Sequence, residues 1–296
     1  MRVFVTGATG WVGSAVVAEL IAAGHVVTGL ARSDAGADKL AATGAQVVRG
    51  VIENLDILRA AARQSDAVIH TAFNHDWAHF AESCAADKCA IEALGAELAG
   101  TERPLIVTTG VALLAPGRLA TEADKAPPVT EAFPRASEAA VENLLSQGLR
   151  ATTVRLAPTV HGVGDHGFVP YLARIARESG VSAYIGDGQN RWPAVHRLDA
   201  ARVYRLALDH VQEGPFHAIA EQGIALKDIA EAIGRQFKLP VVSKSADEAA
   251  DHFGWFARFV GMDAPTSSDH TRAVLGWAPE QLGLLEDLAQ PTYFAQ

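Results

Sequence analysis

Residues 3–13 read Val-Phe-Val-Thr-Gly-Ala-Thr-Gly-Trp-Val-Gly, and this stretch governs the interpretation of the whole chain. Its first four residues are apolar or β-branched, which predicts a short buried strand. A helix is predicted over 13–23, because apolar residues recur there at helical spacing, namely Val16, Val17, Leu20 and Ile21. Three glycines at intervals of three residues thus occupy the turn between a strand and a helix.

The glycines make this turn suitable for a bound pyrophosphate. Gly7 permits a tight turn, Gly10 lets the backbone approach the phosphates, and Gly13 lets the helix pack close to the strand. The first turn of the helix adds free N–H groups and a positive dipole end. A glycine-rich turn without a ligand is the alternative. The order of strand, loop and helix favours a dinucleotide site formed by Gly7, Thr9, Gly10, Trp11, Val12 and Gly13.

Apolar runs and helical patterns alternate along the first half of the chain. Further strands are predicted over 25–30, 45–49, 67–70, 105–109 and 152–156. Helices are predicted between them over 55–64, 77–99 and 137–145. This alternation predicts right-handed βαβ units and an α/β fold, a Rossmann-type doubly wound parallel sheet.

The composition changes after residue 156, where loops rich in Gly, Asp and Asn begin. Helices are predicted over 168–178, 200–210, 226–237 and 271–276, and Asp199 is expected to cap the second of them. We expect a smaller, interleaved C-terminal substrate lobe. The dinucleotide-binding domain is predicted over 1–160 and about 191–213, and the substrate-binding lobe over about 161–190 and 214–296.

The composition excludes several classes of protein. Hydrophobic residues make up 49% of the chain and charged residues 20%, which excludes a disordered protein. A net charge of −9 argues against sequence-independent nucleic-acid binding. The two cysteines, Cys84 and Cys89, can form neither a disulfide framework nor a four-thiolate zinc site. With no signal-peptide pattern or bilayer-length apolar run, we expect a cytoplasmic monomer or homodimer that acts on a small molecule and not at a membrane.

Several segments resemble the short-chain dehydrogenase/reductase superfamily, in particular its extended NAD(P)-dependent epimerase/dehydratase-like branch. The similar segments are the Gly7-x-x-Gly10-x-x-Gly13 loop and residues 66–72, 107–110, 154–162 and 194–201. Together they extend over about residues 1–210. The resemblance implies further cofactor contacts from Val51, Thr71, Ala72, Phe73, Thr108, Pro158 and Val160.

The end of the second predicted strand indicates which cofactor is bound. An NAD-preferring site usually has an acidic residue there, which accepts hydrogen bonds from the ribose 2′-hydroxyl. This chain has Arg32 and Ser33 before its first acidic residue, Asp34. Arg32 can bind a 2′-phosphate through its planar fork of donors, and a solvated surface arginine is the alternative. The sequence therefore favours NADP(H), with NAD(H) as the second choice.

The catalytic motif of the resembled branch is absent from this chain. Members of the branch pair a Ser or Thr with Tyr-x-x-x-Lys, whose lysine lowers the pKa of the tyrosine. Alignment on the helix before the sixth strand puts Pro134 at the tyrosine position and Glu138 at the lysine position. No Tyr-x-x-x-Lys occurs elsewhere in the chain. Any acid–base chemistry must therefore use other residues.

Three residues are candidates for that chemistry. His161 and His166 lie in the segment after the sixth strand, at the sheet edge where α/β proteins bind ligands. Thr109 matches the position of the branch's Ser or Thr. A packing role is the alternative for His161, and His166 is the better candidate to face a substrate. Arg155, on the sixth strand, is expected to form a structural ion pair.

Other residues are expected near the substrate. His75 and His79 have the spacing of neighbours on a helix, but they lack the glutamate of a His-Glu-x-x-His site, and no metal site is predicted. Their segment is expected to line the substrate mouth. The same pocket is expected to be bordered by Arg191, Trp192 and His196. An apolar group is interpreted as lobe core or as a lid over the pocket, and it comprises Trp255, Phe256 and Phe259.

These observations lead to three functional hypotheses. The first is an enzyme, an NAD(P)-dependent oxidoreductase that prefers NADP(H) and acts on a small carbonyl or alcohol with a non-standard acid or base. The second is a redox-neutral epimerase or dehydratase of the same branch. The third is a non-catalytic NAD(P)-binding sensor protein, which the missing tyrosine and lysine favour.

Overall fold

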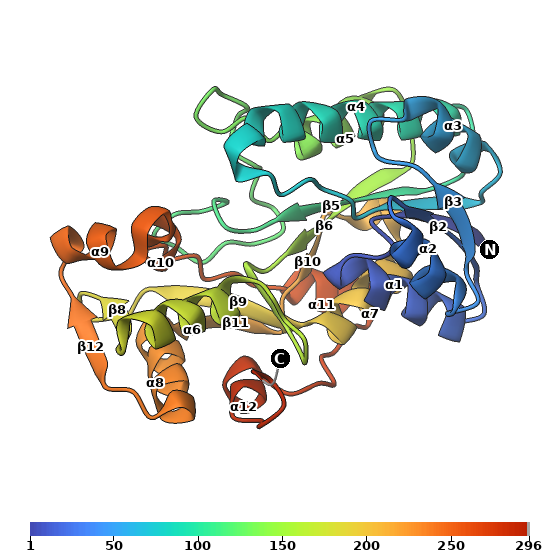
Figure 1. The fold of residues 1–296 in the computed structure, drawn as a ribbon. Coiled ribbons are helices and arrows are strands. Elements are labelled where there is room, and N and C mark those ends of the chain that lie inside the picture. The colour runs from blue at the N-terminus through green and yellow to red at the C-terminus, as the bar shows by residue number, and fades with distance from the viewer. Residues whose placement is uncertain (295–296) are drawn as a thin grey trace.

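The computed structural model describes residues 1–294, and its centre is a seven-stranded sheet (Figure 1). In sheet order the strands are β10 (Phe216–Ala218), β6 (Ala151–Leu156), β5 (Leu105–Gly110), β4 (Ala67–His70), β1 (Arg2–Thr6), β2 (Val26–Ala31) and β3 (Gln46–Arg49). Every neighbouring pair is parallel. The chain runs outward from β1 to β3 and then returns to β4. The strand order therefore reverses beside β1, which is where such sheets bind ligands.

Helices cover both faces of this sheet, because successive strand side chains point to opposite faces. On β1, Val3 and Val5 join one apolar core and Phe4 joins the other. The first core is covered by α1 (Trp11–Ala22), α2 (Asp34–Ala41) and α7 (Arg197–Ala207). The second is covered by α3 (Leu55–Arg63), α4 (Phe80–Leu98) and α5 (Ser137–Ser146), along the upper side of Figure 1. The predicted Rossmann-type parallel sheet is confirmed.

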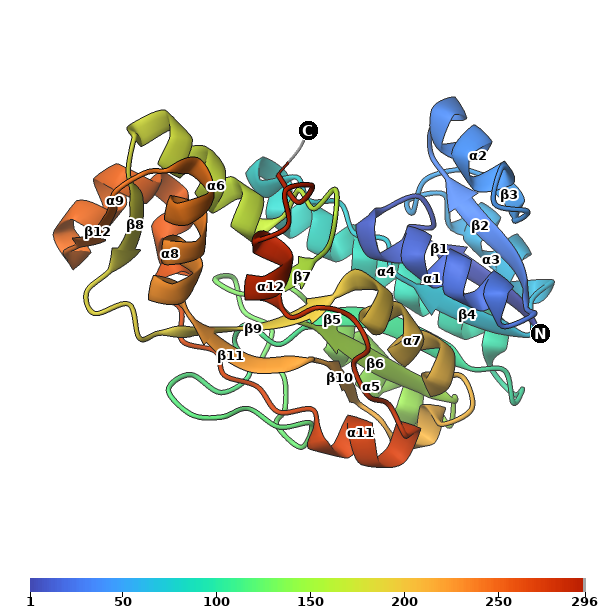
Figure 2. The same ribbon diagram turned by 90° about the horizontal axis from the view of Figure 1, so that it is seen from below.

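A smaller lobe lies to one side of the large sheet (Figure 2). Its strands are β7 (Thr159–His161), β9 (Arg191–His196) and β11 (Glu221–Ala225) in one sheet, and β8 (Ser182–Ile185) and β12 (Val241–Lys244) in another. Its helices are α6 (Phe168–Ser179), α8 (Leu226–Phe237), α9 (Ala246–Phe253), α10 (Ala257–Val260) and α12 (Leu284–Leu288). A separate apolar core holds the lobe together, and its largest buried side chains are Trp192, Phe256 and Tyr293.

The boundary between the two parts differs from the prediction. Residues 214–296 were assigned to the smaller lobe, but β10 forms the edge of the large sheet beside β6. Further along, α11 (Asp269–Leu275) and Trp277 also return to the large sheet, where Leu275 and Trp277 join the core under α1 and α7. Phe216 and Trp277 are almost fully buried, and burial of such large apolar side chains favours this return.

The predicted cap of α7 is wrong. The helix begins at Arg197, and Nδ1 of His196 accepts the N–H of Leu198 (3.3 Å). Asp199, which is 1% exposed, lies inside the helix, where its carboxylate accepts the backbone N–H groups of Glu280 and Gln281. The residue expected to cap α7 therefore binds a distant loop instead.

Two further elements differ from the prediction. The helix expected over 77–99 is divided into a 3-10 turn, η1 (Trp77–His79), and α4. The helix α2 was not predicted, and it begins where Ser33 accepts the N–H of Gly36. Two other 3-10 turns are η2 (Val211–Glu213) and η3 (Gly254–Phe256). Among residues 1–294, no helix has the length and apolar character needed to cross a bilayer.

Candidate functional site

The glycine-rich turn has the geometry that the sequence predicted for it. Gly7 has φ +65°, in the left-handed region that favours glycine. A Cβ atom on Gly13 would lie 2.1 Å from the carbonyl oxygen of Gly7, so α1 can approach β1 this closely only without a side chain there. Gly10 caps α1 through its backbone alone, with φ −79°, and its N–H donates to Gly7.

The N-terminus of α1 is open to an anion. The cap carries no side-chain hydrogen bond, and the first turn has no acidic residue. Unpaired N–H groups and the helix dipole therefore favour negative charge at this point. The cradle that a Cβ would fill and the open helix end both fit a dinucleotide pyrophosphate.

The two residues that follow β4 form hydrogen bonds to Thr6, the residue before the glycine-rich loop. Thr71 Oγ1 donates to the carbonyl of Thr6 (2.7 Å), and the N–H of Ala72 donates to Thr6 Oγ1 (3.3 Å). A Cβ on Gly7 would lie 2.7 Å from the backbone nitrogen of Ala72. Thr71 and Ala72 thus lie beside the predicted cofactor loop, where they fix its base.

Residues predicted at the other side of the cofactor lie at the ends of β2 and β3. Arg32 is exposed, and no ion pair to it occurs among the described residues. Ser33 Oγ accepts the N–H of Gly36 at the start of α2. Asp34, two residues after Arg32, forms an exposed ion pair with Arg49 (2.9 Å). Val51, after β3, is 39% exposed.

Trp11 joins the loop to the segment after β6. Its Nε1 donates to the carbonyl of Val160 (2.7 Å), two residues beyond the half-buried Pro158. The guanidinium of Arg197 lies over the indole ring (4.4 Å), and the ring of His166 meets it edge-on (5.5 Å between centroids). The predicted cofactor residues Trp11, Pro158 and Val160 are therefore brought together with His166.

The predicted lysine position is occupied by a buried ion pair. Arg155 donates through Nε (2.8 Å) and Nη2 (2.6 Å) to the two carboxylate oxygens of Glu138. The Arg155 side chain is 3% exposed, and that of Glu138 is 13% exposed. Thr109 Oγ1 also donates to Glu138 (2.8 Å). The expected structural role of Arg155 is confirmed, and the hydroxyl hydrogen of Thr109 is already committed to Glu138.

His217 on β10 extends this group on the other side of Arg155. His217 Nε2 lies 3.2 Å from Arg155 Nη1, and Nδ1 lies 2.7 Å from the carbonyl of Ser267. Burial lowers the pKa of His217, which favours a neutral ring that donates from Nδ1 and accepts from Arg155 at Nε2. No local sequence pattern predicts the contact of His217 with Arg155, because the two residues lie 62 positions apart.

The two candidate histidines have different environments. His161 is fully buried, and its Nδ1 lies 2.7 Å from Asp287 of α12. Its ring packs edge-on against His196. This position gives His161 no access to a substrate, and its alternative packing role describes the structure better. His166 is exposed, and apart from its ring contact with Trp11 its Nδ1 lies 3.5 Å from the carbonyl oxygen of Gly164.

The interpretation of His75 and His79 as neighbours on one helical face is wrong. His75 precedes η1, because Asp76 accepts the N–H of Ala78 and begins the 3-10 turn there. His79 instead binds Asp76 (3.0 Å), and the His75 ring lies against Phe73. No cluster of potential metal ligands occurs among residues 1–294.

Desolvation and the charge of Arg135 lower the pKa of His75, and His166 contributes in the same direction. His75 and Arg135 both contact the ring of Phe73, so these two side chains lie close together. No sequence motif points to Arg135 as a functional residue, because the Tyr-x-x-x-Lys motif expected in its segment is absent.

Most of the residues expected around the substrate have structural partners. Arg191 pairs with Asp263, and Trp192 is buried with its Nε1 bonded to the carbonyl of Phe259. An aromatic cluster nevertheless links the two lobes: Trp77 lies 6.0 Å from Trp255 and 6.2 Å from Phe259 between ring centroids. Trp77 and Trp255 are about half exposed.

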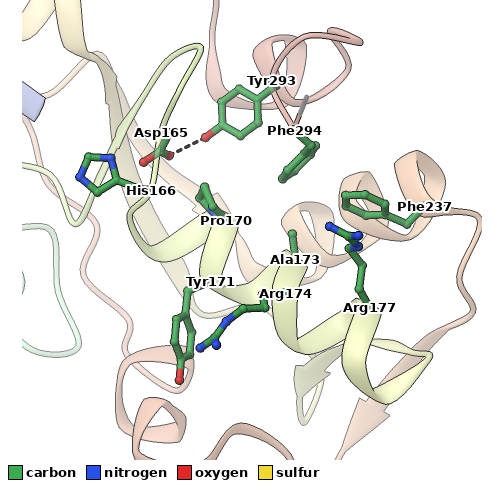
Figure 3. A pocket seen from close by; sticks show the side chains of 10 residues that line it. All are labelled: Asp165, His166, Pro170, Tyr171, Ala173, Arg174, Arg177, Phe237, Tyr293 and Phe294. Atoms are coloured by element: carbon green, nitrogen blue, oxygen red, sulfur yellow. Dashed lines mark hydrogen bonds between the residues drawn. The ribbon is translucent and has the colours of Figure 1, made fainter. Parts of the chain in front are cut away.

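A pocket of about 310 Å³ lies beside His166, between α6 and the C-terminal segment (Figure 3). It is lined by Asp165, His166, Pro170, Tyr171, Ala173, Arg174, Arg177, Phe237, Tyr293 and Phe294. Tyr293 donates to Asp165 (2.6 Å), and burial raises the pKa of both groups. This contact fixes the loop that carries His166.

Comparison with known proteins agrees with this arrangement. The model of the NAD dependent epimerase/dehydratase family matches residues 3–219. An uncharacterized protein of Schizosaccharomyces pombe is 49% identical over 297 residues, which cover 99% of this chain and 100% of that protein. A 4-hydroxy-2-methyl-3-oxo-4-farnesyl-3,4-dihydroquinoline-1-oxide ketoreductase of Stigmatella aurantiaca is 33% identical over 182 residues, which cover 58% of this chain and 54% of the ketoreductase.

The fold is also similar to solved structures. The UDP-glucose-4-epimerase of Stenotrophomonas maltophila, with bound NAD and formylated UDP-arabinopyranose, superposes with a TM-score of 0.76 at 20% identity. The superposition covers 99% of this chain and 97% of the epimerase. At this level of identity, the likeness concerns the fold.

The ion pair of Glu138 with Arg155 predicts that a lysine at position 138 destabilises the protein. Glu138→Lys should lower the free energy of unfolding by about 3–5 kcal/mol, because it leaves Arg155 unpaired beside a second positive charge. Denaturation in urea measures this. Glu142→Lys, at an exposed position on the same helix, should change stability by less than about 0.5 kcal/mol. Equal effects of the two changes would contradict the structural role of Glu138.

The open helix end predicts the effect of a carboxylate at Gly10. Gly10→Glu should abolish dinucleotide binding in calorimetry while the protein remains folded, because the backbone angles suit any residue and the charge occupies the anion position. Gly10→Ala adds only a methyl group and should weaken binding less. Unchanged affinity in Gly10→Glu would show that this loop is not the binding site.

Proposed function

Because the chain belongs to the NAD dependent epimerase/dehydratase family, we propose that it is a nicotinamide-dependent oxidoreductase that prefers NADP(H) and reduces or oxidises a small carbonyl or alcohol. The observation that carries this proposal is the open N-terminus of α1 above Gly7 and Gly13, with Arg32 at the end of the adjacent strand β2. This arrangement supplies donors for a pyrophosphate and a cation for a further phosphate.

The preference for NADP(H) rests on the charges at the end of β2. Arg32 is exposed and has no carboxylate partner among residues 1–294. The carboxylate of Asp34 already pairs with Arg49. Ser33 Oγ accepts a backbone N–H, which leaves its own hydrogen free to donate. Donors thus outnumber acceptors here, as a 2′-phosphate requires.

Nicotinamide supplies or accepts the hydride when the cofactor is bound. The protein must then transfer a proton to or from the substrate oxygen. Thr109 is bonded to Glu138 and His161 to Asp287, both in the interior, so neither suits this role. His166 is exposed, lies against the first residue of α1 and lines the pocket. We assign the proton transfer to His166.

The surroundings of the site support a small apolar carbonyl compound as substrate. Aromatic side chains from both lobes gather beside His75: its ring contacts Phe73 and Trp77, and Trp77 contacts Trp255. The Stigmatella relative is named as the ketoreductase of a farnesyl-bearing dihydroquinoline 1-oxide, a carbonyl compound with a large apolar group. The UDP-sugars bound by the structural neighbours need phosphate-binding groups, and we infer no such substrate here.

The role of Arg32 can be tested by comparing two cofactors. Arg32→Ala should weaken NADPH binding about tenfold to a hundredfold and leave NADH nearly unchanged, because only NADPH carries the 2′-phosphate. Calorimetric titration of both dinucleotides measures the difference. Equal losses for NADPH and NADH would contradict a phosphate contact.

The role of His166 can be tested by turnover. A screen of carbonyl and alcohol substrates, monitored by the absorbance of reduced nicotinamide, provides the assay. His166→Ala should lower turnover about 10²–10⁴-fold with nearly unchanged cofactor affinity, because it removes the acid–base group. His210→Ala, at an exposed histidine that pairs with Glu213, should have no effect.

Two results would contradict this assignment. Wild-type turnover in His166→Ala would exclude the histidine as the proton donor. Tight cofactor binding by the wild type without any turnover across a broad screen would instead favour the sensor hypothesis, which the absent tyrosine and lysine motivate.

A further inference from the structure

A second arginine near the lysine position has contacts unlike those of Arg155. Arg135, just before α5, is half-buried between the ends of β4 and β5. Its guanidinium carbon lies 4.2 Å from the centre of the Phe73 ring. Its Nη2 donates to the carbonyl of Thr108 (3.4 Å), and its Nε donates to Ser137 Oγ (3.2 Å).

The charge of Arg135 is not neutralised by a direct partner. Within residues 1–294, no carboxylate lies within ion-pair distance of it, and its Nη1 donates no hydrogen bond. Arg155, by contrast, uses all three guanidinium nitrogens on protein groups. A guanidinium has five N–H donors, so Arg135 retains donors for a ligand in a fixed, planar arrangement.

A series of hydrogen bonds between buried polar side chains connects Arg135 to the residue before the glycine-rich loop. Ser137 Oγ, which accepts from Arg135, donates to Asp87 (2.6 Å), and Asp87 lies 3.1 Å from His70 Nε2. His70 Nδ1 lies 2.8 Å from Thr6 Oγ1, immediately before Gly7. All four linking side chains are nearly or fully buried.

Asp87 is the acidic member of this hydrogen-bonded series. Burial alone would raise its pKa, but hydrogen bonds from His70 and Ser137 and the charges of His70 and Arg135 hold the pKa below its ordinary value. An ionised Asp87 therefore compensates the charge of Arg135 through Ser137. This arrangement uses only Nε of the guanidinium.

The sheet order indicates which part of a dinucleotide lies near Arg135. The glycine-rich loop follows β1, and β2 and β3 lie on one side of it with Arg32 and Val51 at their ends. On the other side lie β4 and then β5, and Arg135 contacts residues at the ends of both. A dinucleotide whose adenine half points toward β2 and β3 must direct its nicotinamide half toward β4 and β5.

We propose that Arg135 binds the nicotinamide half of the cofactor by donating hydrogen bonds from its guanidinium to the ribose hydroxyls. This rests on the proposed function, since it requires a dinucleotide on the loop. Glu138 is excluded from the role because both its oxygens bind Arg155. A positive charge remains near the nicotinamide, but it comes from three residues earlier in the chain and from a side chain that cannot lose its proton.

Calorimetric titration with two ligands tests this contact. NADPH carries both halves of the cofactor, whereas adenosine 2′,5′-bisphosphate carries only the adenine half. Arg135→Met should weaken NADPH binding about tenfold to a hundredfold and leave the affinity for the fragment unchanged. Arg135→Gln, which keeps a polar group but loses the charge and the fork, should show the same selective loss. Arg59→Gln, on the surface of α3, should alter neither affinity.

Circular dichroism shows whether each variant is folded, independently of both ligands. Equal affinities of the Arg135 variants and the wild type for NADPH would overturn the inference, and so would parallel losses for NADPH and the fragment in folded protein. If the wild type bound neither ligand, the proposed function itself would fail. These outcomes are distinct from one another.

Discussion

The buried pair of Arg155 and Glu138 holds four elements of the large domain together beside the site. It joins β6 to the first turn of α5, and Thr109 adds β5 to the same carboxylate. His217 adds β10 on the far side of Arg155. Charges this deeply buried are stable only when their hydrogen-bonding capacity is used, so these elements have one arrangement relative to one another.

This constraint determines what the site has left for chemistry. Glu138, the predicted lysine position, is part of the structural framework, and the predicted tyrosine position is Pro134. The glycine-rich loop and the open end of α1 are nevertheless intact. Arg135 lies beside the ends of β4 and β5, and His166 lies against Trp11 at the start of α1. The glycine-rich loop thus has the geometry that a dinucleotide requires, and the proposed proton transfer falls to a residue outside the Tyr-x-x-x-Lys positions.

The sequence predicts those parts of the structure that depend on local patterns. The glycine spacing, the alternating strands and the helix over 226–237 follow from neighbours a few residues apart, and the structure confirms the parallel sheet. The partners of polar residues lie much farther away. His161 binds Asp287 across 126 residues, and Asp199 binds a loop 81 residues later. The periodicity of His75 and His79 was misleading because a single Asp76 contact starts a 3-10 turn between them. Arg135 has no local motif, and only the fold shows that it lies between two strand ends.

The proposed site holds a nicotinamide dinucleotide, with Glu138 bonded to Arg155 and with Arg135 at the nicotinamide ribose. A crystal structure of the NADPH complex tests it most directly. The account predicts the pyrophosphate at the N-terminus of α1, the ribose hydroxyls within hydrogen-bonding distance of Arg135, about 3 Å, and an unchanged Arg155–Glu138 pair. A structure in which Glu138 leaves Arg155 to contact the ribose, or in which the dinucleotide lies away from Gly10, would contradict it.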